Sequence, residues 1–161
     1  MTIRAAEGER DGAACAAIYA PYVEGSVVSF EEVAPDAQEM ARRIDAAHEW
    51  LVLERDGAVA GYAYGGVHRT RAAYRRTTEV ALYVDAAHHR TGAGRALYLD
   101  LFDRLRERGF HLALAGVTLP NPASVALHEA LGFRHVGTYH EIGFKAGAWH
   151  DVGWWELPLA R

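Results

Sequence analysis

The stretch Tyr83–Phe102, YVDAAHHRTGAGRALYLDLF, decides the fold, because it leads from an alternating segment through a glycine-containing turn into a helical pattern. Residues 77–84 alternate between two faces, which predicts a strand. One face carries Thr78, Val80, Leu82 and Val84, and the other carries Glu79, Ala81 and Tyr83. Apolar residues at helical spacing then run from Gly94 to Leu105, and Gly109 is expected to end that helix.

The turn between this strand and this helix is predicted to bind an anion. Free N–H groups and the helix dipole favour negative charge at a helix start, and Arg90 and Arg95 add positive charge nearby. The dinucleotide-binding pattern does not match, because Leu97 stands where its third glycine is required. The Gly-Lys-Ser/Thr of nucleoside triphosphate loops is also missing. An ordinary strand-to-helix turn remains the alternative at this point.

The rest of the chain is a regular succession of helices and strands with recognisable boundaries. The boundary signals are Asp11 and Gly25 around a first helix, Asp36 and Ala47 around a second, Asp56-Gly57 in a hairpin, Asn121 and Pro122 at a later helix start, and the turn KAGA at residues 145–148 between the last two strands. The predicted order is β-α-α-β-β-β-α-β-α-β-β, an α/β (α+β mixed sheet) fold. A chain of 161 residues is expected to form one domain over residues 1–161.

Composition narrows the functional classes. Half of the residues are hydrophobic and the net charge is -4, so no general nucleic-acid binding is expected. The single cysteine, Cys15, has apolar neighbours and is expected in the core of a protein from a reducing compartment. Neither a signal peptide nor a membrane span is expected, so a cytoplasmic protein is predicted.

Two further motifs identify a family resemblance. HHRTGAGRAL at residues 88–97, followed by LPNPASVALHEALGF at residues 119–133, resembles the GNAT N-acetyltransferases, whose pyrophosphate loop reads Gln/Arg-x-x-Gly-x-Gly/Ala. YRRTTEVALYV at residues 74–84 and GFKAGAWHDVGWWEL at residues 143–157 are similar to the branch that acetylates phosphinothricin and methionine sulfone or sulfoximine, which also includes arsinothricin acetyltransferases. The resemblance covers nearly the whole chain and implies the GNAT fold with acetyl-CoA as co-substrate.

The resemblance implies a cofactor site at matching positions. The residues implied are Leu82, Tyr83 and Val84 beside the pantetheine, Arg90, Thr91, Gly92, Ala93, Gly94 and Arg95 around the pyrophosphate, and Asn121 and Ser124 near the thiol end. The Gln or Arg that usually opens the loop motif is His89 in this chain. Because the motif binds mainly through main-chain N–H groups, a small effect on cofactor affinity is expected.

The resemblance also implies the catalytic groups. Glu79 matches the acidic position of the general base, and His128 occupies the point on the helix where the general acid lies. An N–H of the strand near Tyr83 would stabilise the oxyanion. The structural alternatives are a carboxylate on a solvated strand face and a half-buried helix histidine. HEALG lacks the second histidine of a zinc protease, since Gly132 stands there, and no metal is expected.

For the acceptor, the resemblance implies a small anionic amino acid, which arginine recognises well. The implied binding residues are Phe30, Arg69, Arg71, Tyr74, Lys145 and His150. The branch forms homodimers, so a homodimer is expected. The alternatives are a protein N-terminal or lysine acetyltransferase, which needs an open peptide groove, and a non-catalytic acyl-CoA sensor, which needs neither Glu79 nor His128.

Overall fold

The computed structural model describes residues 1–160, and its order of helices and strands confirms the prediction. The elements are β1 (Thr2–Ala5), α1 (Gly8–Glu24), α2 (Ala37–Ala46), β2 (Glu49–Arg55), β3 (Ala58–Val67), the short 3-10 turn η1 (Ala72–Tyr74), β4 (Thr77–Val84), the turn η2 (Ala86–His88), α3 (Ala93–Glu107), β5 (Leu112–Leu119), α4 (Pro122–Ala130), β6 (Arg134–Lys145) and β7 (Ala148–Pro158). The class is a mixed α/β fold. In the described part no helix is long and apolar enough to cross a membrane.

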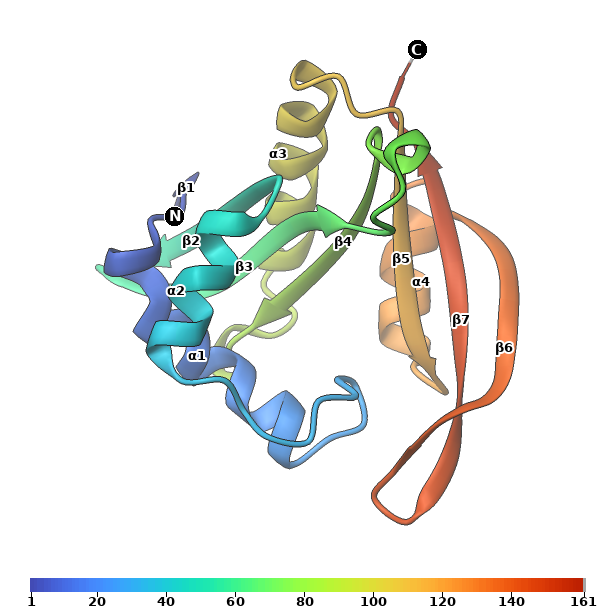
Figure 1. Ribbon diagram of the computed structural model, residues 1–161. Coiled ribbons are helices and arrows are strands. Elements are labelled where there is room, and N and C mark those ends of the chain that lie inside the picture. The colour runs from blue at the N-terminus through green and yellow to red at the C-terminus, as the bar shows by residue number, and fades with distance from the viewer. Residues whose placement is uncertain (161) are drawn as a thin grey trace.

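The seven strands form one sheet in the order β1-β2-β3-β4-β5-β7-β6. Neighbouring strands are antiparallel except for β4 and β5, which are parallel. This parallel pair is short, because only Thr77–Glu79 pair with Leu112–Leu114. Beyond that point the two strands separate, and Figure 1 shows them diverging toward the end of the sheet where α3 begins.

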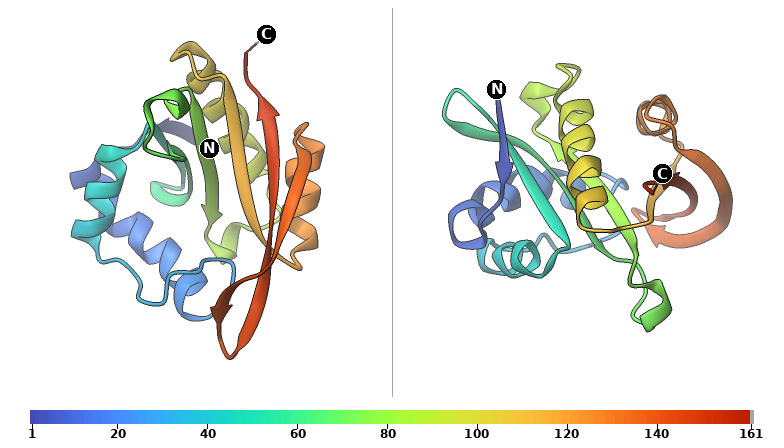
Figure 2. Two further views of the ribbon diagram at one scale, coloured as in Figure 1. Left: turned by 45° about the vertical axis from the view of Figure 1, so that its right-hand side comes forward. Right: turned by 90° about the horizontal axis from the view of Figure 1, so that it is seen from above.

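Helices cover both faces of the sheet (Figure 2). On one face, α3 and α4 pack on a core that includes Leu97, Leu101 and Trp155. On the other face, α1 and α2 pack on a second core that includes Cys15, Met40 and Trp50. The alternation predicted for β4 is confirmed, because Val80 belongs to the first core and Tyr83 packs on the second.

Several turn and cap predictions are confirmed. The second helix begins where predicted, and there Asp36 also caps α2 by accepting a hydrogen bond from the N–H of Glu39 at 2.8 Å. Asn121 caps α4 in the same way through the N–H of Ser124. Asp56 and Gly57 both have positive φ angles, 51° and 79°, as a two-residue hairpin turn requires.

The prediction that Asp11 caps the first helix is wrong. The helix begins a turn earlier, at Gly8, and Asp11 lies inside it with an exposed fraction of 1%. Its carboxylate accepts two hydrogen bonds from the guanidinium of Arg4, at 2.7 and 2.8 Å, and one from the N–H of Glu7. The buried ion pair with β1 therefore holds the carboxylate in the helix while it still satisfies a donor at the helix start.

Candidate active site

A groove opens where β4 and β5 separate, with a volume of about 550 Å³. From Val80 onward β4 has no strand partner on its β5 side, so its main-chain groups on that edge are free to pair with an extended ligand. Predicted cofactor and catalytic residues that line the groove are Leu82, Tyr83, Val84, Arg90, Gly92, Ala93, Gly94, Arg95, Asn121, Ser124 and His128. The groove also includes Tyr22, Tyr98 and Thr118, which no sequence motif singled out.

The loop at one end of the groove has the geometry of an anion site. Arg90 and Gly92 have positive φ angles of 59° and 82°, and Gly92 stands at the N-cap of α3. Within the described chain no side chain caps this helix, so the N–H groups of its first turn are available to a ligand. The loop amides and the helix dipole therefore fit the pyrophosphate of acetyl-CoA.

Two side chains of this loop have structural partners. The Thr91 hydroxyl donates to the carbonyl of His88 at 2.6 Å and accepts from Arg55 at 2.7 Å, and Thr91 is not among the lining residues of the groove. The His89 ring contacts the carbonyl of Val84 at 3.0 Å and the hydroxyl of Tyr22 at 2.9 Å through Nε2. The departure from the usual motif thus joins the loop to the end of β4 and to α1.

His128 lies at the inner side of the groove and is buried, with an exposed fraction of 5%. Its Nδ1 lies 2.7 Å from the carbonyl oxygen of Ser124, so this nitrogen carries the proton and donates. Its Nε2 lies 3.1 Å from the hydroxyl of Tyr98 and is the acceptor in the neutral ring. Burial lowers the pKa of His128, although the bond to Ser124 opposes this effect.

Glu79 lies at the closed end of the separation, one residue before β4 loses its partner. Its side chain is on the face opposite Val80, toward α1 and α2, and it is not among the residues that line the groove. The carboxylate Oε1 lies 3.1 Å from Nδ1 of His68, a contact that the sequence reasoning missed. The predicted base therefore lies just outside the closed end of the groove, on the side of β4 that Tyr83 also faces.

The predicted acceptor residues form two groups, and the first is at the tip of the β6–β7 hairpin. The rings of Phe30 and His150 are 6.2 Å apart, and Phe30 lies directly over Gly143. The ammonium of Lys145 donates to the carbonyls of Val23 and Ser29 at 2.6 and 2.7 Å. These contacts join the hairpin tip to the loop between α1 and α2.

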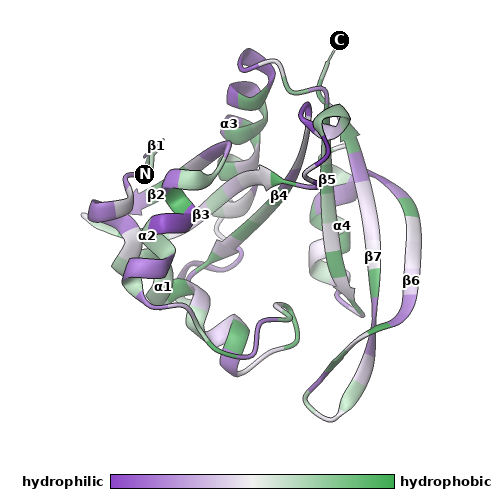
Figure 3. Ribbon diagram, in the orientation of Figure 1, coloured by the Kyte–Doolittle hydropathy of each residue, from purple (hydrophilic) through white to green (hydrophobic). Residues whose placement is uncertain are grey.

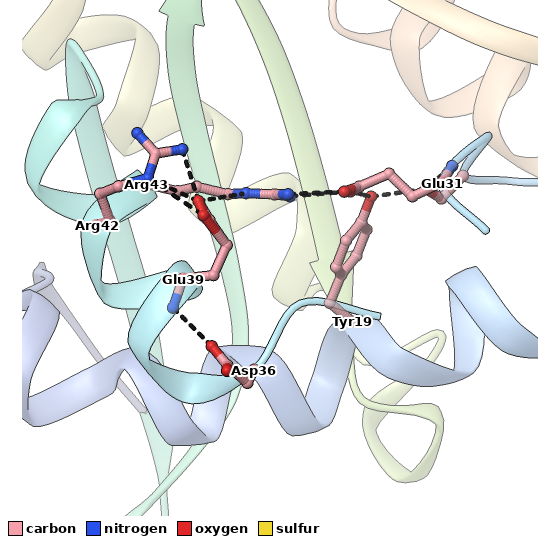
Figure 4. A network of polar contacts seen from close by, with 7 residues as sticks. Tyr19, Glu31, Asp36, Glu39, Arg42 and Arg43 are labelled. Atoms are coloured by element: carbon pink, nitrogen blue, oxygen red, sulfur yellow. Dashed lines mark hydrogen bonds and ion pairs between the residues drawn. The ribbon is translucent and has the colours of Figure 1, made fainter. Parts of the chain in front are cut away.

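Polar contacts within the first half of the chain hold that same loop (Figure 4). Glu31, next to Phe30, accepts two hydrogen bonds from the guanidinium of Arg43, at 2.7 and 2.9 Å, and another from the hydroxyl of Tyr19. The hydrogen bonds from Arg43 are the main reason why the pKa of Glu31 is lowered. Phe30 is thereby fixed between α2 and the hairpin.

The second group lies in the loop between β3 and β4. The guanidinium of Arg69 is 6.0 Å from the centre of the Tyr74 ring, and Arg71 is exposed at the start of η1. Arg69 also lines a pocket of about 380 Å³ with Trp154 and Tyr139. The structure does not bring this group to Phe30.

Among residues 1–160 no cluster of three or more His, Cys, Asp or Glu side chains could hold a metal ion.

Comparison with known proteins agrees with this geometry. The model of the Acetyltransferase (GNAT) family matches residues 15–133. A phosphinothricin N-acetyltransferase of Streptomyces viridochromogenes is 42% identical over 155 residues, which cover 92% of this chain and 85% of the relative. An L-methionine sulfoximine/L-methionine sulfone acetyltransferase of Salmonella typhimurium is 34% identical, with 99% of this chain and 95% of the relative covered.

Solved structures give the same result. The structure of yncA from Salmonella typhimurium with its cofactor acetyl-CoA has a TM-score of 0.95 and 34% identity, covering 100% of this chain and 95% of that one. A phosphinothricin acetyltransferase from Sinorhizobium meliloti in complex with acetyl-CoA has a TM-score of 0.93 and 35% identity, covering 99% and 88%. The chain belongs to the GNAT family and is an acetyl-CoA-dependent N-acetyltransferase.

Proposed function

We propose that this enzyme acetylates the α-amine of a small anionic amino acid of the phosphinothricin, methionine sulfone, methionine sulfoximine or arsinothricin type. The observation that carries the proposal is the position of Glu79, a carboxylate one residue before the point where the groove begins, on the face of β4 toward α1 and α2. An amine that approaches on that face meets the thioester without displacing the cofactor. This arrangement supports direct attack in a ternary complex, which is part of the proposal. The names of the relatives supply the substrate class.

Two groups of the chain are assigned to the attack on the thioester, a base and a hydrogen-bond donor. Acetyl-CoA supplies the acetyl thioester. Glu79 accepts the proton of the acceptor amine, directly or through a water molecule, and with an amine pKa of about 8 or somewhat above only a weak base is needed. A main-chain N–H of β4 near Tyr83 donates to the carbonyl oxygen as negative charge develops on it.

We assign the proton for the leaving thiolate to His128, and the hydroxyl of Tyr98, 3.1 Å from Nε2, supports a route through that side chain. In the protonated ring Nε2 donates to the Tyr98 oxygen while the Tyr98 hydroxyl passes its own proton to the sulfur. Because burial lowers the pKa of His128, this acid form is a minor species at neutral pH. The assignment is tested by His128→Ala, which should slow the reaction; full activity would leave His128 with a structural role alone.

We further propose a homodimer in which each acceptor site combines the Phe30 group of one subunit with the Arg69 group of the other. Trp154, which shares a pocket with Arg69, is four residues from His150 along β7, a separation of about 13 Å. A small amino acid is too short to contact the side chains of both groups in the same subunit. A second copy can supply one of the two groups.

An apolar surface on the outer strands supports this dimer. Figure 3 shows short hydrophobic bands between hydrophilic ones along β6 and β7, and large apolar side chains there are more than half exposed. These residues are Val136, Tyr139, Ile142, Phe144 and Trp149. An exposed surface of this kind is typical of an interface between subunits.

Location in the cytoplasm stays a prediction from the sequence.

Release of free CoA thiol tests the function. Phosphinothricin, methionine sulfone, methionine sulfoximine, arsinothricin and a peptide would each be offered as acceptor. Turnover with the small amino acids alone is expected, and Glu79→Gln should lower kcat by about 10²- to 10⁴-fold with acetyl-CoA binding unchanged. Turnover with the peptide alone would indicate a protein acetyltransferase, and acetyl-CoA binding without turnover would indicate a sensor.

Mixing two variants with impaired acceptor turnover tests the shared site. Phe30→Ala and Arg69→Met would be purified separately, checked for mass in solution, and then combined. If the two groups come from different subunits, mixed dimers contain one complete site and regain activity. A monomer in solution, or dimers that regain no activity on mixing, would refute the shared site.

A further inference from the structure

His68 makes the one side-chain hydrogen bond found for Glu79 among residues 1–160. It directly follows β3, and the pairing of Val67 with Thr78 brings it across from the start of β4. Nδ1 of His68 lies 3.1 Å from Oε1 of Glu79. The imidazole is mostly buried, with its side chain 16% exposed, whereas the side chain of Glu79 is 38% exposed. A semi-buried ring therefore holds one oxygen of a more exposed carboxylate.

Two neighbours of the ring, Glu79 and Arg69, indicate which nitrogen carries the proton. The Nε of Arg69 lies 3.4 Å from Nε2 of His68 and can only donate. Nε2 must then accept, so the neutral ring carries its proton on Nδ1 and donates it to Glu79. The result is a chain of donors from Arg69 through His68 to Glu79.

Aromatic contacts fix the plane of the ring. The indole of Trp154 meets the His68 ring nearly at right angles, with centroids 5.8 Å apart, and Tyr74 does so at 6.3 Å. Trp154 is itself packed on Gly116, where an added Cβ would lie 3.0 Å from the indole. The ring is thus held by three elements, β3, β7 and the loop before β4.

We propose that His68 is a positioning residue for Glu79, and that Arg69 selects the tautomer in which it can act. The inference rests on the proposed role of Glu79 as the base. Binding of Oε1 to the ring fixes the rotation of the carboxylate and leaves Oε2 to accept the proton of the amine. A base whose orientation is set by a third group is the arrangement that recurs in activated catalytic pairs.

The kinetic test compares two substitutions of the same residue. His68→Ala removes the donor and should lower kcat by about 10- to 100-fold without changing KM for acetyl-CoA. In His68→Asn the side-chain amide places an N–H near the position of Nδ1, so most of the activity should return. The matched control is His48→Asn, because His48 bonds to β4 through Thr78 at 3.0 Å on the opposite face. Equal losses in the Ala and Asn variants of His68 would overturn the proposal.

A double variant separates this inference from the function on which it rests. If His68 acts through Glu79, then adding His68→Ala to the Glu79→Gln variant should lower kcat hardly any further. Additive losses would overturn the positioning role. If Glu79→Gln alone has no effect, the proposed base is wrong; if Glu79→Gln is slow but His68→Ala is at full speed, only the present inference is wrong.

A readout that needs no turnover is the 15N NMR spectrum of the histidine rings. The His68 signals, assigned by their loss in His68→Asn, should report a proton on Nδ1. Replacing Arg69 with Met should raise the population of the other tautomer. A wild-type ring protonated on Nε2 would overturn the proposal whatever the kinetics.

Discussion

Gly143→Ala should damage acceptor binding and leave acetyl-CoA binding intact. A Cβ at this position of β6 would lie 2.3 Å from Cε2 of Phe30 and 2.6 Å from its Cζ. Ordinary van der Waals contact begins at 3.4 Å, so the phenyl ring has to move by at least about 1 Å. The substitution therefore displaces the predicted apolar wall of the acceptor site without removing any of its atoms.

The expected magnitude follows from the surroundings of the ring. Overpacking costs about 1–3 kcal/mol when a side chain cannot move away, but Phe30 is 37% exposed and has an outlet to solvent. We expect the unfolding free energy to fall by about 1 kcal/mol, the lower limit of this range, which corresponds to a fall in Tm of about 2–4 °C. Loss of the contact between the ring and the acceptor should lower kcat/KM for the acceptor about tenfold, which corresponds to about 1.4 kcal/mol.

The assay is a double-mutant cycle with Phe30→Ala. Unfolding free energy and kcat/KM for the acceptor are measured for both single variants and the double variant, with acetyl-CoA affinity from calorimetry as the internal control. Because the three atoms nearest to the added methyl group all belong to the Phe30 ring, Gly143→Ala should have little effect once Phe30 is alanine. The reasoning is refuted if the two effects are additive, or if acetyl-CoA affinity falls together with acceptor turnover.

Three further predictions concern the cofactor loop, the first helix and pH. Gly92→Ala meets no atom within 4 Å but must adopt a φ of 82°, so it should cost about 1–2 kcal/mol of unfolding free energy and weaken acetyl-CoA binding in calorimetry, with kcat unchanged at saturation. Asp11→Ala leaves the Arg4 guanidinium without its buried partner and should cost about 3 kcal/mol in urea unfolding; a cost below 1 kcal/mol would mean that the pair contributes little. The lowered pKa of His128 means that protonation favours the unfolded chain, so unfolding free energy should fall below pH 6.5 by up to about 1.4 kcal/mol per pH unit, and His128→Gln should reduce this slope.

Elements with local signals could be predicted from the sequence. The alternation of residues 77–84 assigned Val80 and Glu79 to opposite faces, and Asn121 with Pro122 marked the start of α4, because both signals depend on neighbours in the chain. Asp11 has an equally good local signal as a cap, but its contact with Arg4 depends on how β1 packs beside α1. A tertiary contact overrode a local preference there.

The contact between His68 and Glu79 could not be predicted for a related reason. The two residues are separated by the arginine loop, and nothing in the spacing of that loop shows how far it folds back. The register of β3 against β4 determines whether the two side chains meet. Because Val67 pairs with Thr78, His68 lies near Glu79 on the same face of the sheet. A one-residue change in this register would have turned the side chain of Glu79 to the other face of the sheet.

The same alternation in β4 explains how acceptor specificity can vary while the cofactor site is kept. The groove is lined by β4 and the start of α3, whereas the proposed acceptor residues lie in the loop with Phe30, the arginine loop and the hairpin tip. Lys145 illustrates the division, since both hydrogen bonds found for its ammonium go to carbonyls of the α1–α2 segment. Its ammonium holds that loop in place, so in the proposed function the arginines between β3 and β4 are the cations that remain for an anionic acceptor group. Substitutions in those loops can therefore change the acceptor without disturbing the loop at residues 90–95.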